Sequence, residues 1–239
     1  SRETDRIPNH FRRRPRAMNS PNQPLTSPLT PLLTPRGFQE LMGVSDGVLE
    51  RLEAYVALLR KWQPKINLVG GRSLKDVWRR HILDSAQLGP LLPAAGGVVA
   101  DIGSDAGFPG MVLAITEDHG KAEIHLIESS ERKCAFLGEV NRMTQAGAII
   151  HHCRVENLPE LKADVVTARG VASMVKLLLY ANPMLKKGGQ CLFLKGKKWR
   201  EELTEAKKNW IIKESLIPSL SDTSGMVVKL EKIAQRNDS

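Results

Sequence analysis

Cysteine is scarce in this chain, and no long hydrophobic run occurs in it. Only three of its 239 residues are cysteines, Cys134, Cys153 and Cys191, and no two of them have the C-x-x-C spacing of a zinc or redox motif. A sparse, odd number of cysteines indicates a reducing compartment, so we expect a cytoplasmic protein. Charged residues, glycine or proline break every apolar stretch before it reaches the length of a membrane span. We therefore expect neither a metal site nor a membrane segment.

Acidic residues are outnumbered, with 26 Asp and Glu against 35 Lys and Arg, and the formal net charge is +9. Part of this excess lies in residues 1–17, where six arginines accompany only Glu3 and Asp5. Two further basic clusters lie within residues 60–80 and 186–213. Their members are Arg60, Lys61, Lys65, Arg72, Lys75, Arg79 and Arg80, and then Lys186, Lys187, Lys195, Lys197, Lys198, Arg200, Lys207, Lys208 and Lys213. Such clusters suit a polyanionic partner, and a solvated surface is the alternative.

Residues 1–36 contain little that can fold. They hold seven of the fourteen prolines and a Pro-Leu-Thr repeat, so we expect a disordered basic leader. The chain begins at Ser1, and Met18 follows the arginine-rich stretch. We therefore expect the natural start at Met18, with residues 1–17 an added remnant or an upstream extension. An organellar targeting signal is the alternative, which Glu3, Asp5 and the prolines weaken.

A glycine-rich turn beginning at Gly103 follows a β-branched, apolar run at residues 98–102 and precedes an apolar helix. The turn lacks the G-x-G-x-x-G fingerprint of dinucleotide-binding proteins, because Asp105 and Phe108 occupy the later glycine positions. It also lacks the Gly-Lys-Ser/Thr ending of a P-loop. With Gly107, what remains resembles motif I of S-adenosylmethionine (SAM)-dependent methyltransferases. An ordinary strand-turn-helix crossover is the alternative.

Carboxylates lie at the ends of the first two predicted strands. Asp101 precedes the glycine turn, and Glu128 ends the second strand. An acidic residue at the end of the second strand of a Rossmann-type unit can accept both ribose hydroxyls of a nucleoside. The sequence therefore predicts a nucleoside pocket, which Gly103 and Gly107 open to the ligand and Phe108 walls.

The remaining chain divides into a helical segment and a strand-helix segment. Over residues 37–92, Ser45 is predicted to cap one helix, and Ser73 with Asp76 resembles the capping box of another. We expect strands at 98–102, 122–127, 148–152, 163–167, 189–194, 209–217 and 226–233, and helices near 107–116, 130–146, 171–182 and 200–208. The alternation predicts an α/β domain over residues 93–239. Its doubly wound, seven-stranded, mostly parallel sheet with an antiparallel last strand is the class I methyltransferase layout.

Three more loops follow predicted strands and should reach the same edge of the sheet. After the third strand, Val155 can pack on adenine and Glu156 can read its amino group, although a loop ion pair is the alternative for Glu156. After the fourth strand, Arg169 faces the pocket mouth or forms a surface salt bridge. Lys195 ends the fifth strand beside it. Arg169 and Lys195 are thus the candidates for positioning the methyl acceptor.

Two catalytic sequence motifs of base methyltransferases are missing. Thr-Ala-Arg-Gly replaces the Asn/Asp-Pro-Pro-aromatic motif of amino-directed enzymes, and no Pro-Cys pair supplies the nucleophile of pyrimidine C5 enzymes. The lone pair of guanine N7 can attack a methyl group without either motif. Catalysis on N7 reduces to holding that nitrogen in line with the sulfonium methyl group, and an Arg or Lys near O6 or a phosphate can orient it.

Several motifs occur together in order along the chain. They are Asn67-Leu68-Val69, Arg80-His81-Ile82-Leu83-Asp84-Ser85, the glycine turn, Glu128-Ser129 with Lys133 to Leu137, Arg154-Val155-Glu156, Thr167-Ala168-Arg169 and Lys195-Gly196. Over about Gly37 to Ile233, this set resembles the RsmG (GidB) family of bacterial small-subunit rRNA guanine-N7 methyltransferases. The resemblance implies a soluble enzyme that uses SAM to methylate a guanine in the 530 loop of 16S rRNA, either free or in an assembling 30S subunit. We expect this enzyme to be a monomer and to hold no metal.

The resemblance also implies site residues. The SAM contacts it implies are Gly103, Phe108, Val155, Glu156 and Arg169, to which the residue arguments add Asp101, Gly107 and Glu128. Candidate RNA contacts are Arg79, Arg80, His81, Lys195, Lys197 and Lys198, with a buried packing role equally open for His81.

One position departs from the family pattern, because Asp105 replaces its middle glycine. Asp tolerates a positive φ better than most residues, and its carboxylate can either repel the SAM carboxylate or pair with the SAM ammonium group. We predict that SAM binding survives. A class I methyltransferase acting on a small molecule and a degenerate RNA-binding module are the rival interpretations.

Overall fold

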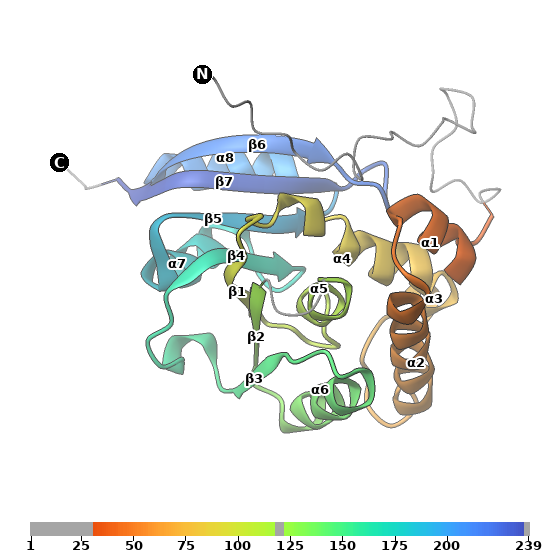
Figure 1. Ribbon diagram of the computed structural model, residues 1–239. Helices are drawn as coiled ribbons and strands as arrows, with labels where there is room; N and C mark the ends of the chain where they lie inside the picture. The colour runs from red at the N-terminus through yellow and green to blue at the C-terminus, as the bar shows by residue number, and fades with distance from the viewer. Residues whose placement is uncertain (1–30, 118–121, 237–239) are drawn as a thin grey trace, which may run out of the picture.

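The computed structural model describes residues 31–117 and 122–236. Most of the predicted disordered leader, including Met18, lies outside these residues. One seven-stranded sheet has the order β3-β2-β1-β4-β5-β7-β6 (Figure 1). The strands are β1 (Gly97–Ile102), β2 (Ala122–Glu128), β3 (Ile149–His152), β4 (Ala163–Arg169), β5 (Leu185–Lys195), β6 (Trp210–Pro218) and β7 (Met226–Gln235).

The first five strands are parallel to one another, and β7 is antiparallel to both of its neighbours, β5 and β6. The loop between β6 and β7 is too short for a crossover helix, so the chain turns back and β7 inserts between β5 and the edge strand β6. The predicted mostly parallel sheet with an antiparallel last strand is confirmed.

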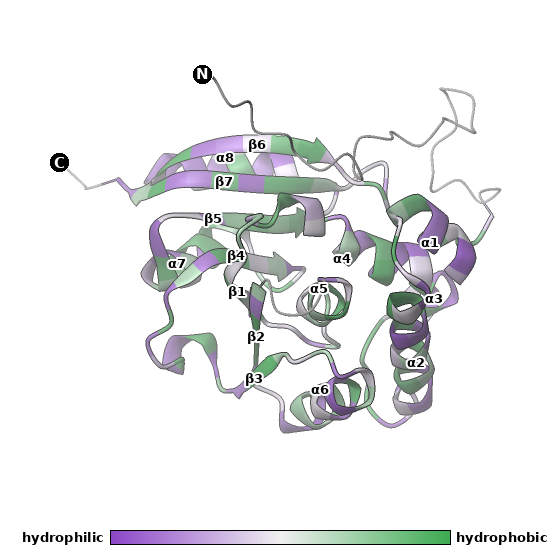
Figure 2. Cartoon of the chain, viewed as in Figure 1, coloured by the Kyte–Doolittle hydropathy of each residue, from purple (hydrophilic) through white to green (hydrophobic). Residues whose placement is uncertain are grey.

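Helices cover both faces of the sheet (Figure 1). One face packs against α2 (Asp46–Trp62), α5 (Gly110–Thr116) and α6 (Glu131–Thr144), and the other against α7 (Met174–Met184) and α8 (Trp199–Asn209). Figure 2 shows hydrophobic residues along the strands and α5, with hydrophilic residues toward the outside of α1 and α2. Burial of these two apolar layers positions the carboxyl ends of the parallel strands at one edge.

The N-terminal helices follow local capping signals. The Ser45 side chain accepts a hydrogen bond from the Val48 amide and begins α2, as predicted. Before it, α1 (Pro35–Met42) begins with Thr34 as its cap, whose Oγ1 accepts from the Gly37 amide at 3.0 Å. The first residues of α1 thus fall within the predicted leader, where Thr-Pro provides a cap followed by a residue suited to the first helical position.

The segment that follows differs from the predicted capped helix. Ser73 lies inside the short helix α3 (Gly71–Lys75), and Asp76 follows that helix, so the predicted capping box is wrong. The Asp76 carboxylate instead accepts from Arg79 Nε at 3.2 Å and from the Leu33 amide at 3.3 Å. These tertiary partners outweigh the local capping pattern.

A π-helix, η2 (Trp78–Leu83), continues the chain into α4 (Asp84–Ala86). The Asp84 amide bonds to the Arg79 carbonyl five residues back, which is the spacing that defines a π turn. Such turns widen a helix locally and occur often at functional sites. The π-helix places His81 and Asp84 together beside Arg169 at the end of β4.

Candidate active site

The glycine turn after β1 is open toward a cavity of about 350 Å³, the central pocket. Gly103 has a φ of +61°, and a Cβ atom there would lie 2.7 Å from Val171 Cγ2. Only glycine combines this left-handed backbone with so close an approach. The turn therefore presents bare backbone at the carboxyl edge of the sheet, as the motif predicts.

Glu128, the last residue of β2, lies at this carboxyl edge and lines the central pocket. Its Oε2 accepts from the Asp105 amide at 2.9 Å, and its Oε1 accepts from the Ser130 amide at 2.8 Å. These bonds fix the carboxylate between the glycine turn and the start of α6. Each carboxylate oxygen keeps a second lone pair, so Glu128 can still accept hydrogen bonds from ribose hydroxyls.

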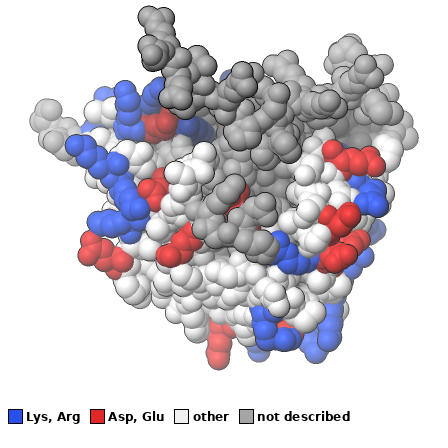
Figure 3. All heavy atoms as spheres, in the orientation of Figure 1, with Lys and Arg blue, Asp and Glu red and all other residues white. Residues whose placement is uncertain are grey.

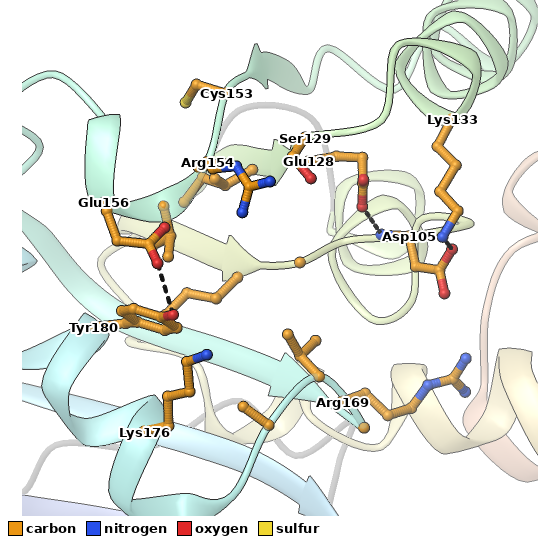
Figure 4. Close-up of a pocket in the computed structure, with 17 residues that line it drawn as sticks. Asp105, Glu128, Ser129, Lys133, Cys153, Arg154, Glu156, Arg169, Lys176 and Tyr180 are labelled. Atoms are coloured by element: carbon orange, nitrogen blue, oxygen red, sulfur yellow. Dashed lines mark hydrogen bonds and ion pairs between the residues drawn. The ribbon is translucent and has the colours of Figure 1, made fainter.

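Asp105 adopts the backbone that its position requires, with a φ of +54°. Its carboxylate forms an ion pair with Lys133 Nζ at 2.6 Å, in the first turn of α6 (Figure 4). The added negative charge is thus balanced from the neighbouring helix. Sequence reasoning missed Lys133 as a site residue. Its position in the first turn of the helix that follows Glu128 was the available signal, because that helix begins beside the glycine turn.

The opposite side of the central pocket holds Val155 and Glu156, as predicted. Glu156 Oε1 accepts a hydrogen bond from the Tyr180 hydroxyl at 2.8 Å, and Lys176 lies 5.5 Å from the centre of the Tyr180 ring (Figure 4). Tyr180 and Lys176 come from α7, where no sequence pattern indicated a site. A hydrogen bond from its own backbone amide, together with the one from the Tyr180 hydroxyl, lowers the pKa of Glu156 and keeps the carboxylate ionised.

Three of the predicted cofactor residues lie behind the pocket wall instead of lining it. Asp101 is fully buried, and its carboxylate accepts from Thr167 Oγ1 at 2.8 Å and from the Gly110 amide at 3.1 Å. A side chain at Gly107 would collide with the Tyr55 hydroxyl, and Phe108 is buried against the Tyr55 ring. These residues shape the turn in this structure, and their contacts with SAM stay predictions.

Arg169 ends β4 and joins three cavities. It lines the central pocket, a second cavity of about 460 Å³ beside Asn67 and Val69, and a third of about 170 Å³ beside the β6–β7 loop. We call the second the Asn67 pocket and the third the hairpin pocket. The Arg169 guanidinium lies 4.9 Å over the Phe108 ring, which fixes its height above the glycine turn.

His81 holds Arg169 in place through a defined chain of hydrogen bonds. A guanidinium can only donate, so His81 Nδ1 accepts from Arg169 Nη2 at 2.9 Å. The proton therefore sits on Nε2, which donates to Ser73 Oγ at 2.8 Å. Burial, with Arg169 and Arg80 nearby, lowers the pKa of His81 to about 3. His81 is thus neutral and buried, stacked on Phe108 with a centroid distance of 4.9 Å.

The residues that follow His81 complete this support. Asp84 Oδ2 lies 3.4 Å from Arg169 Nη1, and Asp84 Oδ1 accepts from Ser221 Oγ at 2.5 Å in the β6–β7 loop. Ser85 Oγ donates to the His81 carbonyl at 2.7 Å and stabilises the turn. The Arg-His-Ile-Leu-Asp-Ser segment therefore converges on Arg169 from one side.

Comparisons with known proteins fit this geometry. The sequence model described as "GidB: rRNA small subunit methyltransferase G" matches residues 48–226. The chain belongs to the GidB family. Among its relatives, a protein named ribosomal RNA small subunit methyltransferase G from Paramagnetospirillum magneticum is 48% identical over 202 residues, covering 83% of this chain and 97% of that one. Another of that name, from Rhodospirillum centenum, is 50% identical over 199 residues, with 83% and 91% covered.

A solved structure supports the fold assignment. The crystal structure of a SAM-dependent methyltransferase from Aquifex aeolicus has a TM-score of 0.52 against this chain at 15% sequence identity. The alignment covers 67% of this chain and 95% of that one. The class I methyltransferase fold of this GidB family member is thus confirmed. Within the described residues, no helix combines the length and the apolar character that crossing a bilayer requires.

Two of the predicted RNA contacts are already engaged inside this GidB family member. Arg79 is buried, pairs with Asp76 and donates to the Pro31 carbonyl at 2.7 Å. The Lys195 side chain is only 5% exposed, and its Nζ contacts Glu202 Oε2 at 2.6 Å. Both side chains are thus held by acidic partners in the fold, and Lys195 also lines the hairpin pocket with Arg169, so their contacts with RNA stay predictions.

The second basic cluster is divided between the two ends of the molecule. Lys197 and Lys198 are exposed just after β5, at the carboxyl edge beside Arg169. Helix α8 then runs away from this edge, and Figure 3 shows Lys and Arg gathered over the far ends of α8, β6 and β7. Some of these distant cations are paired, such as Lys207 with Glu214 and Lys208 with Glu205. Only part of the cluster therefore lies near the site.

Proposed function

We propose that this chain transfers the methyl group of SAM to N7 of a guanine in the 530 loop of 16S rRNA. Membership of the GidB family gives the reaction class. The observation that carries the choice of atom is His81, which is neutral and has both ring nitrogens engaged by Arg169 and Ser73. The site thus lacks a free imidazole base among its described residues, and the N7 lone pair needs none.

The central pocket fits SAM in the chemistry of its walls. Glu128 offers acceptors for ribose hydroxyls, and Val155 with Glu156 offers an apolar surface and an acceptor for adenine. A side chain at Gly103 would fill the space beside Val171, so bare backbone is required there. Lys133 and Arg169 supply positive charge for a carboxylate. Together these groups match the adenine, the ribose and the amino-acid carboxylate of SAM.

When bound, SAM supplies an electrophilic methyl group on a sulfonium. The guanine N7 lone pair forms the new bond as the carbon–sulfur bond breaks, and no proton is released. What the chain contributes is position, because Arg169 is held by Phe108, His81 and Asp84 at the junction of the three cavities. Burial also raises the pKa of Cys153 in the central pocket, which favours the thiol form of this side chain at neutral pH.

The exposed cations around the carboxyl edge suit an RNA backbone. Lys65 and Arg72 are exposed and lie, in sequence, two residues before and two residues after the stretch 67–70 that lines the Asn67 pocket. Lys197 and Lys198 are exposed just after the end of β5. Arg80 lies at the hairpin pocket and is 45% exposed at its side chain. An RNA crossing this edge would meet cations on both sides of Arg169, as binding to phosphates requires.

The decisive experiment is methyl transfer from labelled SAM to 16S rRNA, free and in 30S subunits, with the product nucleoside identified after digestion. We expect 7-methylguanosine confined to the 530 loop. Glu128→Gln should weaken SAM binding in calorimetry, because the ribose loses a charged acceptor. Glu123→Gln is the matched control, since Glu123 lies on the same strand outside the central pocket.

Each rival predicts a different result. A small-molecule methyltransferase would bind SAM and leave every form of rRNA unmodified. A degenerate RNA-binding module would bind rRNA with no SAM binding at all. Methylation of rRNA at another atom or loop would contradict only the finer part of the proposal.

A further inference from the structure

The hairpin pocket lies between Arg169 and the loop that joins β6 to β7. Its volume is about 170 Å³, and its walls include Arg80, Asp84, Arg169, Ser221 and Asp222. It shares Arg169 and Gly170 with the central pocket. A group bound in the hairpin pocket would therefore lie next to one bound in the central pocket, with Arg169 between them.

The walls of the hairpin pocket are fixed by contacts between distant segments. The Leu220 amide donates to Gln87 Oε1 at 2.8 Å, and Gln87 Nε2 donates to Ser219 Oγ at 3.2 Å. With the bond from Ser221 to Asp84, these contacts attach the loop to the segment that holds Arg169. The pocket is thus built before any ligand arrives, which reduces the entropy lost on binding.

Asp222 presents a carboxylate oxygen to this pocket. Its Oδ1 accepts from both the amide and the hydroxyl of Ser224, each at 2.8 Å, which orients the side chain. Its Oδ2 forms an ion pair with Arg80 Nη1 at 3.6 Å, a distance longer than that of a hydrogen bond. Asp222 Oδ2 therefore has acceptor capacity for a ligand, while the side chain remains 29% exposed.

We propose that the hairpin pocket binds the target guanine and that Asp222 selects it by its Watson–Crick edge. The inference rests on the proposed function. N7 must face the methyl group in the central pocket, and O6, on the same edge, then meets the donors of Arg169. The next groups around the ring are N1–H and the exocyclic amino group, which are donors. They require an acceptor, and Asp222 supplies one; adenine has no proton on N1 to offer.

The charge of the hairpin pocket also suits the reaction. Methylation at N7 leaves a positive charge on the purine ring, so a carboxylate near N1–H stabilises charge that develops in the transition state. The Asn67 pocket offers the cations Lys133 and Arg169, with Asp105 already paired to Lys133. Formal charge does not separate the two pockets, because the hairpin pocket also holds the cations Arg80, Arg169 and Lys195. The hairpin pocket is the better site for the base because the Asp222 carboxylate lies 3.6 Å from its cation, whereas the Asp105 carboxylate is tightly paired at 2.6 Å.

The test uses two 16S rRNAs that differ only at the target nucleotide, which is guanosine in one and inosine in the other. Inosine keeps N7, O6 and N1–H and lacks the exocyclic amino group. We expect wild type to prefer guanosine by about tenfold in kcat/KM, the loss that accompanies one hydrogen bond to a charged group. Asp222→Asn should lower kcat/KM on guanosine by about tenfold and bring the guanosine-to-inosine ratio close to one.

The controls separate this inference from the proposed function. Glu214→Gln, in the middle of β6 and outside the hairpin pocket, should keep the wild-type ratio, and calorimetry should give wild-type SAM affinity for Asp222→Asn. Equal rates for wild type on both RNAs, or an unchanged ratio in Asp222→Asn, would overturn the role of Asp222 and leave the methylation itself intact. No transfer to the guanosine RNA by wild type would instead overturn the proposed function.

Discussion

At the scale of single residues, Asp105 shows how one substitution in a glycine motif is accommodated. The position needs a left-handed φ, which Asp tolerates at a cost of roughly 1–2 kcal/mol. The nearby Lys133 then removes the second difficulty, which is an unbalanced negative charge at the pocket. Sequence reasoning foresaw both difficulties and did not foresee the lysine, because the ion pair forms between the glycine turn and a separate helix.

The pair predicts a coupled effect on SAM affinity. Lys133→Met leaves the Asp105 carboxylate unbalanced in the central pocket, so we expect weaker SAM binding by about tenfold, within the range of coupling between contacting residues. The double variant Asp105→Gly/Lys133→Met should recover most of that loss. Calorimetric SAM titrations of wild type, both single variants and the double variant form the cycle. Equal affinities for Lys133→Met and the double variant would contradict the coupling.

Asp101 predicts a pH dependence of stability. Burial raises its pKa from 3.8 to about 6 in the folded state. A carboxyl group with a raised folded pKa contributes its full stability below pH 4 and loses it as the pH rises through 6. Wild type should therefore lose up to about 3 kcal/mol of unfolding free energy relative to Asp101→Asn between pH 4 and pH 7.

Urea unfolding of wild type and Asp101→Asn at several pH values measures this difference. Subtracting the two curves removes the contribution of His81, whose depressed pKa acts in the opposite direction over an overlapping range. A difference that stays constant from pH 4 to pH 7 would show that Asp101 does not titrate as its burial indicates.

At the scale of elements, α2 acts as a brace for the glycine turn. The Tyr55 hydroxyl donates to the Ala106 carbonyl, and the Tyr55 ring stacks on Phe108 at a centroid distance of 5.3 Å. Tyr55→Phe leaves this carbonyl without its partner in a buried place, so we expect a loss of about 1–2 kcal/mol in unfolding free energy. Chemical denaturation measures it. Tyr180→Phe is the matched control, because its hydroxyl is exposed, and it should change stability by less than about 0.5 kcal/mol.

The elements themselves were largely predictable from sequence. Each predicted strand and each helix of the α/β part is found within a few residues, because apolar periodicity and turn residues agree along that part of the chain. The segment at 71–86 was not predictable in detail. Its local capping pattern, from Ser73 to Asp76, is overridden by distant partners, Arg79 and Leu33 for Asp76 and His81 for Ser73.

The candidate site was predictable where a residue ends a strand and less so where a helix supplies it. Glu128, Val155, Glu156 and Arg169 are found at the central pocket, since strand ends share one edge in a parallel sheet. Tyr180 was missed because a side chain on one turn of α7 carries no local signal. The sequence also could not show which lysines and arginines are neutralised by ion pairs, because a buried lysine and a free one look alike in sequence.

At the scale of the whole molecule, the distribution of charge predicts where RNA binds. Lys197→Glu/Lys198→Glu changes exposed cations at the carboxyl edge, whereas Lys207→Glu/Lys208→Glu changes cations at the far end of α8. We expect the first double variant to raise the KM for rRNA and to flatten the dependence of log affinity on log salt, by about 0.7–0.9 for each phosphate that the protein no longer neutralises. The second should leave the salt slope unchanged.

Filter binding of rRNA across a range of salt concentrations measures both slopes, and SAM titrations check that the central pocket is intact. Equal reductions of affinity in the two double variants would indicate nonspecific attraction by net charge. A reduction of affinity only in Lys207→Glu/Lys208→Glu would place the RNA at the end of the molecule opposite to Arg169.

The π-helix at residues 78–83 has a consequence for how the length of this chain can change. Its extra residue per turn is equivalent to a single-residue insertion into an α-helix. Deleting one residue there would therefore restore an ordinary α-helix and leave Asp84 and Gln87 facing Arg169 and the β6–β7 loop as they do now, whereas the same deletion inside an α-helix turns everything after it by about 100°. The π-helix should thus tolerate the loss of one residue better than α2 does. Parallel deletion scans through residues 77–85 and through α2 would reveal the difference.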